Sequence, residues 1–269
     1  MEIELQLPNG KDYLSPSSSK KLYKHPMSYL EYAKNNFKPS DEMIFGQYYE
    51  DMLYSENLNK YYILDDEAII EKAVKERGSE SANIRATKEY KSYKAEALEE
   101  SKGKVVLSKE KVDIANTMKD IMVSSKVFDE HLDGDTQVEM SSYINTDEFI
   151  VNALVRSDVV KKKGKLVVND LKTTSTEIDK WLYQAKKLDY DIQAYLTYEV
   201  WNADDFNFIV QRTQGLHDIG IFNVARGGWF WESGRAKFNK AVNNYIDFIS
   251  PESLALGINP SHYIFSMQM

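Results

Sequence analysis

The apolar and polar positions of the chain alternate between spacings typical of helices and spacings typical of strands. Helices are predicted near residues 16–35, 40–57, 67–77, 87–100, 108–130, 176–187, 191–201 and 231–249. Strands are predicted near residues 61–65, 105–107, 137–143, 149–155, 165–172, 206–211 and 219–224. This order predicts a mixed α/β fold whose central sheet contains antiparallel hairpins and is flanked by helices.

Turn and cap residues set the expected limits of the elements. Ser15 and Pro16 are typical of a helix start, and they predict a first helix that continues to about Asn35. Ser40 and Ser108 predict caps for two further helices. We find no internal repeat, low-complexity tract or long linker in the sequence, so we expect one domain over residues 1–269, with an N-terminal helical portion at residues 1–60.

Charged residues follow two apolar segments in the middle of the chain. Asp158 ends one segment, and Asp170 and Lys172 end the segment that begins with Leu166-Val167-Val168. Because side chains of a strand alternate between its faces, Asp170 and Lys172 are expected on one face and Leu171 on the other. If the two segments pair as a hairpin, Asp158 lies near both. A buried strand that ends in two charges needs a physical reason, because unpaired buried charges are costly.

Two carboxylates and an ammonium at one strand end are the side chains needed for metal-assisted cleavage of a phosphodiester. Magnesium prefers oxygen ligands and is often held by one or two carboxylates together with substrate phosphate. Bound metal lowers the pKa of its water, and a neighbouring lysine can stabilise the transition state. An isolated Asp-x-Lys is a weak signal, since these residues are abundant here, and most such matches are solvated strand ends.

Composition narrows the class of protein. With 269 residues, 42% of them hydrophobic and 12% aromatic, the chain has the make-up of a globular protein with a substantial core. No apolar run is long enough for a membrane span and no leader pattern is present, so we expect no membrane association. The lack of cysteine excludes disulfides, zinc–thiolate sites and iron–sulfur clusters, and it fits a cytoplasmic location. A net charge of −8 argues against a generally basic nucleic-acid coat, although a local basic channel is compatible with it.

Five segments together resemble a known family. They are LSPSSSKKL at residues 14–22 with His25-Pro26, FGQYYEDML at residues 45–53, QVE at residues 137–139, RSD at residues 156–158 with DLKTT at residues 170–174, and YDIQ at residues 190–193. In this order they resemble the PD-(D/E)XK nuclease superfamily. Within it they are most similar to phage-type exonucleases of the exodeoxyribonuclease VIII (RecE) kind, and more distantly to lambda exonuclease and RecB nuclease domains. The resemblance implies a restriction-endonuclease-like core, with the catalytic part at residues 135–225.

The resemblance also implies roles for residues. Asp158 and Asp170 would bind Mg²⁺ or Mn²⁺, with the Leu171 carbonyl as a further ligand, and Lys172 would position or activate the attacking water. Gln193 would shape the site from the helix behind the sheet. Glu50 stands where the exonuclease VIII branch has histidine, and other branches use glutamate there as a metal ligand. Glu139 is a candidate for a residue that contacts the metal ligands without binding the metal itself.

The lysine-rich turn between the two charged segments has two interpretations. Lys161, Lys162, Lys163 and Lys165 most simply form a solvated hairpin tip, with Gly164 at the turn. The functional alternative is that these lysines contact DNA phosphates. Similarly, Glu139 on an alternating strand is more often exposed than functional.

The activity implied by the resemblance is metal-dependent hydrolysis of linear double-stranded DNA from the 5′ end, which leaves a 3′ single strand for a strand-annealing recombinase in phage-type recombination. It also implies a ring-shaped homo-oligomer, double-stranded DNA ends as partner, and, if the protein is phage-encoded, the bacterial host cytoplasm as location. Two alternatives stay open. One is a RecB-like or Cas4-like single-strand nuclease, of which the iron–sulfur type is disfavoured by the missing cysteines. The other is a non-catalytic module of the same fold that binds DNA ends.

Overall fold

The computed structural model describes residues 2–34, 38–54 and 57–263. The chain divides into two compact units, which are described separately below. The first unit comprises residues 1–38 and 126–269, and the second comprises residues 39–125. The N-terminal helical portion expected at residues 1–60 is therefore shared between the two units, and the expectation of one domain over the whole chain stays a prediction.

A five-stranded mixed sheet forms the centre of the first unit, in the order β3-β4-β5-β6-β7. Its strands are β3 (Asp135–Asn145), β4 (Ile150–Lys163), β5 (Lys165–Thr174), β6 (Asp205–Arg212) and β7 (Ile219–Val224). Neighbouring strands are antiparallel except β5 and β6, which are parallel. The connection between β5 and β6 contains α7 (Trp181–Lys187) and α8 (Tyr190–Trp201), as a parallel pair requires. The predicted mixed α/β fold class is confirmed.

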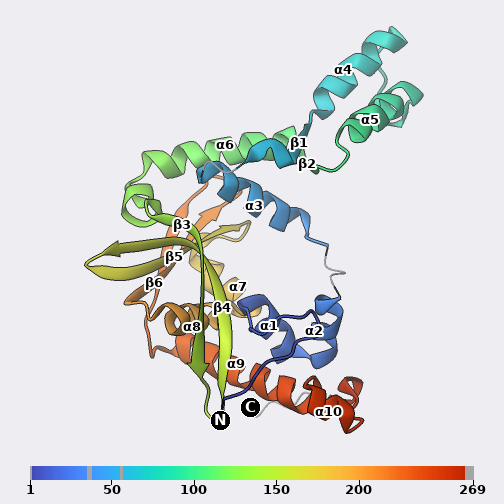
Figure 1. Ribbon diagram of the computed structural model, residues 1–269. Helices are drawn as coiled ribbons and strands as arrows, with labels where there is room; N and C mark the ends of the chain where they lie inside the picture. The colour runs from blue at the N-terminus through green and yellow to red at the C-terminus, as the bar shows by residue number, and fades with distance from the viewer. Residues whose placement is uncertain (1, 35–37, 55–56, 264–269) are drawn as a thin grey trace. The chain divides into compact units, whose positions relative to one another are not determined.

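The β4–β5 hairpin turns at a single residue. Gly164 has a φ of +76°, a conformation that glycine adopts without steric cost, and Lys163 pairs directly with Lys165. The predicted boundary was wrong here, because Lys161 to Lys163 belong to β4 and not to a polar loop. The end of this hairpin reaches beyond the neighbouring strands in Figure 1. A strand at that position is solvated on both faces, so it accepts lysines that sequence patterns assign to a turn.

The remaining helices of the first unit build outward from α8, which packs on the sheet through β3, β4 and β6. They are α1 (Pro16–Lys24), α2 (Pro26–Ala33), α9 (Trp229–Phe248) and α10 (Pro251–Ala255). α1 and α9 pack on α8, α2 packs on α1, and α10 packs on α9. The single helix predicted from Pro16 to about Asn35 is wrong: α1 ends at Lys24, because His25 is extended with a φ of −167° before Pro26. His25 then caps α2, its Nδ1 accepting a hydrogen bond from the Met27 amide at 3.1 Å. Asn35 lies outside the described residues.

Close packing of α8 against α9 fixes the helix that later contributes to the site. At Gly234 of α9, an added Cβ would stand only 2.0 Å from the Asp191 carbonyl oxygen of α8. Only glycine permits this approach. Tyr195 of α8 packs on Phe238 of α9 beside this crossing, and at the start of α8 the buried Trp181 stacks on Tyr190 and contacts Phe208 of β6. The core therefore holds the start of α8 rigidly beside β5.

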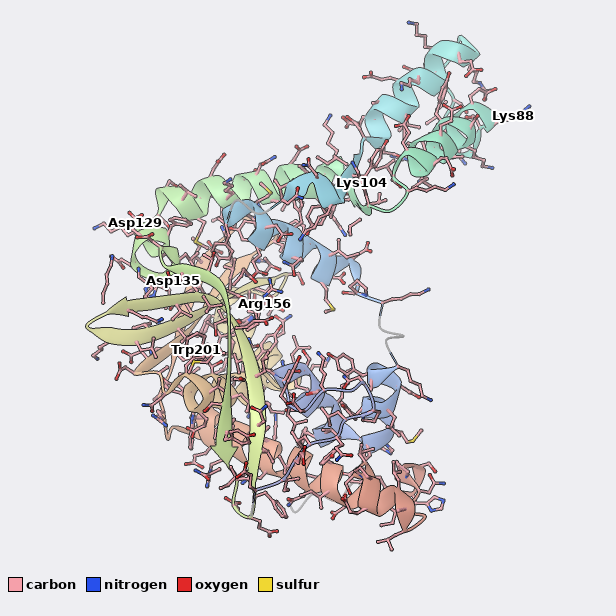
Figure 2. The ribbon with its side chains drawn as sticks, in the orientation of Figure 1. Lys88, Lys104, Asp129, Asp135, Arg156 and Trp201 are labelled. Atoms are coloured by element: carbon pink, nitrogen blue, oxygen red, sulfur yellow. The ribbon has the colours of Figure 1, made fainter. Side chains whose placement is uncertain are left out.

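The second unit contains helices and a separate two-stranded sheet. Its elements are α3 (Asp41–Leu53), β1 (Tyr61–Leu64), α4 (Asp66–Arg77), α5 (Lys88–Glu100), β2 (Val105–Ser108) and α6 (Lys109–Ser124). β1 and β2 pair in parallel. Figure 2 labels Lys88 at the start of α5 and Lys104 just before β2; both residues are exposed. Ser40 and Ser108 cap α3 and α6 as predicted, but α6 ends at Ser124 instead of about Glu130.

In the part of the chain that the structure describes, no helix combines the length and the apolar character that crossing a bilayer requires.

Candidate active site

The sequence-predicted carboxylates lie where β4 and β5 separate. The β4–β5 ladder runs from Lys163 and Lys165 to its last pair, Val159 and Asn169. Beyond that pair the Asp158 carboxylate, and not a backbone carbonyl, accepts the hydrogen bond from the Leu171 amide, with Oδ2 at 2.7 Å from the nitrogen. Asp158 therefore bridges the two strands at the position where their backbones diverge, and its carboxylate is held beside Asp170.

Asp170 and Lys172 lie on one face of β5, as strand alternation predicts. The Lys172 ammonium forms an ion pair with Asp170 Oδ2 and lies 3.3 Å from the Leu171 carbonyl oxygen. Asp170 is 3% exposed and Leu171 is also buried. We call Asp158, Asp170 and Lys172 the hairpin base; it is a cluster of two carboxylates and one ammonium in which Asp170 is buried and the other two side chains are partly exposed.

The electrostatics of the hairpin base keep Lys172 protonated. Burial lowers the pKa of Lys172, but the carboxylates of Asp170 and Asp158 outweigh burial, so that its pKa lies above the ordinary value for lysine. At neutral pH this side chain is an ammonium that donates hydrogen bonds. It is therefore suited to stabilising negative charge or orienting a water molecule, and unsuited to accepting a proton.

The first turns of α8 bring two further side chains to the hairpin base. Gln193 Nε2 donates a hydrogen bond to Asp170 Oδ1 at 2.5 Å. The ring of Tyr190 lies with its centroid 5.4 Å from the Lys172 ammonium. Burial raises the pKa of Tyr190, so its hydroxyl stays neutral. Gln193 thus holds one oxygen of Asp170 in place, while Lys172 contacts the other.

A buried ion network holds the start of α8. Asp189 precedes the helix in the left-handed conformation, with a φ of 54°, and Asp191 lies in its first turn. Lys237 of α9 bridges both carboxylates, with its Nζ 2.7 Å from Asp189 Oδ1 and 2.8 Å from Asp191 Oδ2. Lys24 of α1 pairs with Asp189 Oδ2 at 2.8 Å, and the Ser233 hydroxyl donates to Asp191 at 2.6 Å. These contacts fix Tyr190, which lies between the two aspartates.

Lys20 of α1 is a site residue that the sequence interpretation missed. Its ammonium lies 4.4 Å from the centroid of the Tyr190 ring. Burial and the neighbouring Lys172 ammonium lower the pKa of Lys20 to about 7, against the opposing influence of Asp170, Asp189 and Asp191. Lys20 lies within one of the segments that carry the family resemblance, but no local spacing rule links it to Asp170.

Other predicted residues lie apart from the hairpin base. Glu139 is exposed on β3, opposite Arg156 of β4; Figure 2 labels Arg156. Lys161 donates to the carbonyl oxygens of Asp129 and Glu130 at 2.7 and 2.8 Å. We call residues 162–165 the hairpin tip; its three lysines are exposed, and Lys165 lies 3.6 Å from Asp205.

Glu50 belongs to α3 in the second unit, and its assignment as a metal ligand stays a prediction. On the same helix, the neighbouring Asp51 is the buried carboxylate. It accepts a hydrogen bond from the Tyr61 hydroxyl and pairs with Lys60 at 2.8 Å. Asp51 is therefore neutralised within its own unit.

The residues of the hairpin base fit a magnesium or manganese ion. Two carboxylates with an adjacent backbone carbonyl are oxygen donors of the kind that these hard cations prefer, and magnesium commonly retains water and substrate phosphate as its other ligands. Over residues 2–34, 38–54 and 57–263 no group of three or more His, Cys, Asp or Glu side chains is arranged to hold a metal. Asp158, Asp170 and the Leu171 carbonyl offer oxygen donors, and three donors leave positions for water and substrate phosphate around a hard cation.

Comparison with known proteins supports the fold. No family model matches this chain, and no curated protein matches it. Among solved structures, a protein of Eubacterium rectale provisionally described as an exonuclease superposes with a TM-score of 0.56 at 13% identity, covering 100% of this chain and 96% of that one. A phage-related exonuclease of Haemophilus somnus 129PT gives a TM-score of 0.37 at 14% identity, covering 87% of this chain and 93% of that one. At these identities, the first similarity shows a shared fold.

Proposed function

We propose that this protein is a metal-dependent exonuclease that hydrolyses linear double-stranded DNA from the 5′ end. The observation that carries the proposal is the hairpin base, where Asp158, Asp170 and a protonated Lys172 converge at the point of strand separation. The fold shared with a protein described as an exonuclease, and the family resemblance of the sequence segments, support the same reaction class. A strand-annealing recombinase as partner and a ring-shaped oligomer belong to the proposal through that resemblance.

Each residue of the site has a distinct task in this proposal. Asp158, Asp170 and the Leu171 carbonyl would hold Mg²⁺ or Mn²⁺, which supplies charge neutralisation and an activated water when bound. Gln193 orients Asp170 through its hydrogen bond at 2.5 Å. Lys172 stays protonated and donates to the attacking water or to a phosphate oxygen as negative charge develops there.

Digestion of end-labelled DNA tests the proposal. A linear duplex labelled at the 5′ or the 3′ end would be incubated with Mg²⁺, with Mn²⁺ and with EDTA, alongside a covalently closed circular duplex. Metal-dependent release of the 5′ label first, with the circle left intact, is the expected result. The Asp170→Ala variant should be inactive, and Lys163→Ala, at the hairpin tip, should retain cleavage.

Other outcomes would overturn parts of the proposal. Preferred digestion of single-stranded DNA would replace it by a RecB-like activity, and initial release of the 3′ label would reverse the polarity. Binding of duplex ends by well-folded wild-type protein without cleavage in either metal would identify a non-catalytic end-binding module. Cleavage that persists undiminished in Asp170→Ala would remove the hairpin base from the mechanism.

A further inference from the structure

Lys20 is held against the site by the packing of α1. The helix begins with a capping box in which the side chains of Ser15 and Ser18 accept each other's backbone amides, and Leu22 is fully buried. These contacts fix the rotation of α1 and direct Lys20 over the Tyr190 ring at 4.4 Å. The same ring lies 5.4 Å from the Lys172 ammonium. Two lysines of distant sequence positions therefore approach one aromatic side chain.

Two other lysines of this region, Lys172 and Lys237, form ion pairs with carboxylates. Lys20 forms none within the described part of the chain. Lys172 pairs with Asp170, and Lys237 pairs with Asp189 and Asp191. For Lys20, no carboxylate among the residues that the structure describes lies within ion-pair distance of the ammonium. The aspartates that surround it are already engaged by other cations.

The Lys172 charge repels the half-buried Lys20 ammonium, and this repulsion is unfavourable without an anion. The Tyr190 ring offers a cation–π contact, which compensates only part of the lost hydration. The lowered pKa of Lys20, at about 7, reflects the same imbalance. An anion bound close to both ammoniums would offset the repulsion between Lys20 and Lys172 and would stabilise the charged form of Lys20. The hairpin base next to them is where the proposed substrate presents a phosphate.

We propose that Lys20 is a phosphate-binding residue of the site: its ammonium, held over the Tyr190 ring that Lys172 also approaches, contacts a non-bridging oxygen of the DNA phosphate at the hairpin base. This inference rests on the proposed function and deepens it. Lys172 is committed to Asp170 before substrate arrives, and Lys20 adds a second positive charge that the substrate can neutralise. As the phosphate gains negative charge during hydrolysis, the contact strengthens.

Steady-state cleavage of a linear duplex tests this role. Lys20→Met keeps the length of the side chain and removes its charge, and we expect kcat/KM to fall by about 10²–10³-fold, as for other donors aimed at developing charge. Lys20→Arg should recover most of the activity, because it restores a positive charge at that position. The matched control is Lys21→Met, the next residue of α1, which makes the same change in net charge and should cleave like wild type.

Salt dependence separates a phosphate contact from a structural effect. Binding of a fluorescent duplex in EDTA would be measured by anisotropy over a series of NaCl concentrations. A lysine that touches a phosphate contributes about 0.7–0.9 to the slope of log affinity against log salt. The slope should decrease by about this amount in Lys20→Met and remain unchanged in Lys21→Met. An unchanged slope in Lys20→Met would overturn the contact.

Thermal stability shows whether Lys20→Met is folded. Because the pKa of Lys20 is lowered in the folded state, the unfolded chain binds its proton more readily, and the charged lysine destabilises the fold. Lys20→Met should therefore raise Tm below pH 7. The gain should fade as the pH rises from about 7 toward the ordinary lysine value of about 10.4.

The combined results separate the two proposals. Lower activity and a smaller salt slope, with higher Tm, would support the Lys20 contact. Wild-type activity in Lys20→Met, with Lys172→Ala inactive, would overturn the Lys20 inference and leave the nuclease intact. If wild type bound duplex but did not cleave it, the nuclease proposal would fail. A smaller slope in Lys20→Met would then still support a phosphate contact at this position, whereas an equal slope would overturn it.

Discussion

The two ends of the β4–β5 hairpin carry charged residues in very different surroundings. At the tip, Lys162, Lys163 and Lys165 are exposed. At the base, Asp170 is 3% exposed and forms contacts with Lys172 and Gln193 through both of its oxygens. In the sequence both ends are simply charged segments beside an apolar strand.

Burial of charged groups, more than their number, distinguishes the candidate site from the hairpin tip. Charges at the tip are solvated and screened, so they influence nearby groups weakly. At the base, the Asp170 and Asp158 carboxylates outweigh burial and raise the pKa of Lys172. Burial and the Lys172 ammonium lower the pKa of nearby Lys20. Substitutions at the two ends should therefore have effects of different kinds and sizes.

The largest contrast is expected for catalysis. Lys172→Ala at the base should lower kcat/KM by about 10³-fold or more, because it removes a charged donor from the transition state. That loss corresponds to about 4 kcal/mol of barrier. Lys163→Ala at the tip removes the same charge from a solvated position and should leave kcat close to that of wild type. Both would be measured by initial rates of cleavage of an end-labelled duplex.

The cleavage rate of Lys172→Ala can contradict the catalytic role proposed for Lys172. The fold should survive the substitution, since Asp170 keeps its hydrogen bond from Gln193, and circular dichroism would verify this. More than a tenth of wild-type activity in a clean, folded preparation would show that Lys172 is not part of the chemistry.

The next largest effect is expected on stability, where a lysine of the ion network at the start of α8 is compared with a lysine of the hairpin tip. Lys237→Met would leave Asp189 and Asp191, which are 5% and 1% exposed, without their shared cation. Breaking a buried ion pair in this way costs about 3–5 kcal/mol. We expect the free energy of unfolding, measured in urea, to fall by about 3 kcal/mol. Lys163→Met, with an exposed side chain at the tip, should unfold at the wild-type urea concentration.

The pH dependence of the Lys237 variant gives a second check. Burial lowers the pKa of Lys237, but hydrogen bonds and charge from Asp189 and Asp191 outweigh burial and raise the pKa. A raised lysine pKa stabilises the fold below the ordinary value of about 10.4, and the stabilisation is lost as the pH rises through the higher folded-state pKa. The deficit of Lys237→Met should thus be constant near neutrality and shrink in strong alkali. A deficit that vanished at pH 7 would show that the network does not stabilise α8.

A smaller effect is expected at Gln193, which touches the base without touching the reacting phosphate in our proposal. Gln193→Ala removes the donor that orients Asp170, and we expect apparent metal affinity to weaken by about 10–100-fold. Titration of cleavage with Mn²⁺ measures this. High metal should restore much of the Gln193→Ala activity and little of the Lys172→Ala activity. If high Mn²⁺ restored neither variant, Gln193 would have to act on the substrate directly.

Much of the fold was predictable from local sequence, because caps and apolar spacing act within a few residues. Thr87 caps α5, and the β7 bounds were predicted correctly. The errors have physical causes. Pro26 interrupts a pattern that otherwise continues as one helix, and the polar end of β4 has no apolar alternation to reveal it. The parallel β5–β6 pair and the division into two units depend on long-range packing, which local patterns do not encode.

In the candidate site, too, some residues are predictable from local sequence and others are brought in only by long-range packing. Strand alternation predicts that Asp170 and Lys172 share a face, and pairing of the hairpin predicts that Asp158 lies near them. The hydrogen bond from the Leu171 amide to Asp158 was not predicted. Gln193 was suggested by family resemblance and not by spacing. Lys20 reaches the site only because α1 packs beside α8, so no pattern of neighbouring residues could indicate it.

The smallest expected effect belongs to the hairpin tip. Lys162 and Lys163 are exposed at the end of β4, where the hairpin reaches beyond the neighbouring strands. If the tip contacts the DNA backbone, as one interpretation of the sequence suggested, a Lys162→Ala, Lys163→Ala double variant should bind duplex with a salt slope smaller by about 0.9 for each lost phosphate contact. Its kcat should stay within about twofold of wild type, because rim charges change association more than chemistry.

The base and the tip then become distinguishable in a single data set. Anisotropy titrations at several NaCl concentrations measure the slope, and cleavage at saturating duplex measures kcat. Because solvated lysines act through counterion release, the tip variant should lose affinity at low salt and converge with wild type at high salt. A slope equal to that of wild type would assign the tip lysines to solvation only, and a large loss of kcat would show that the tip and the base act together in the reaction.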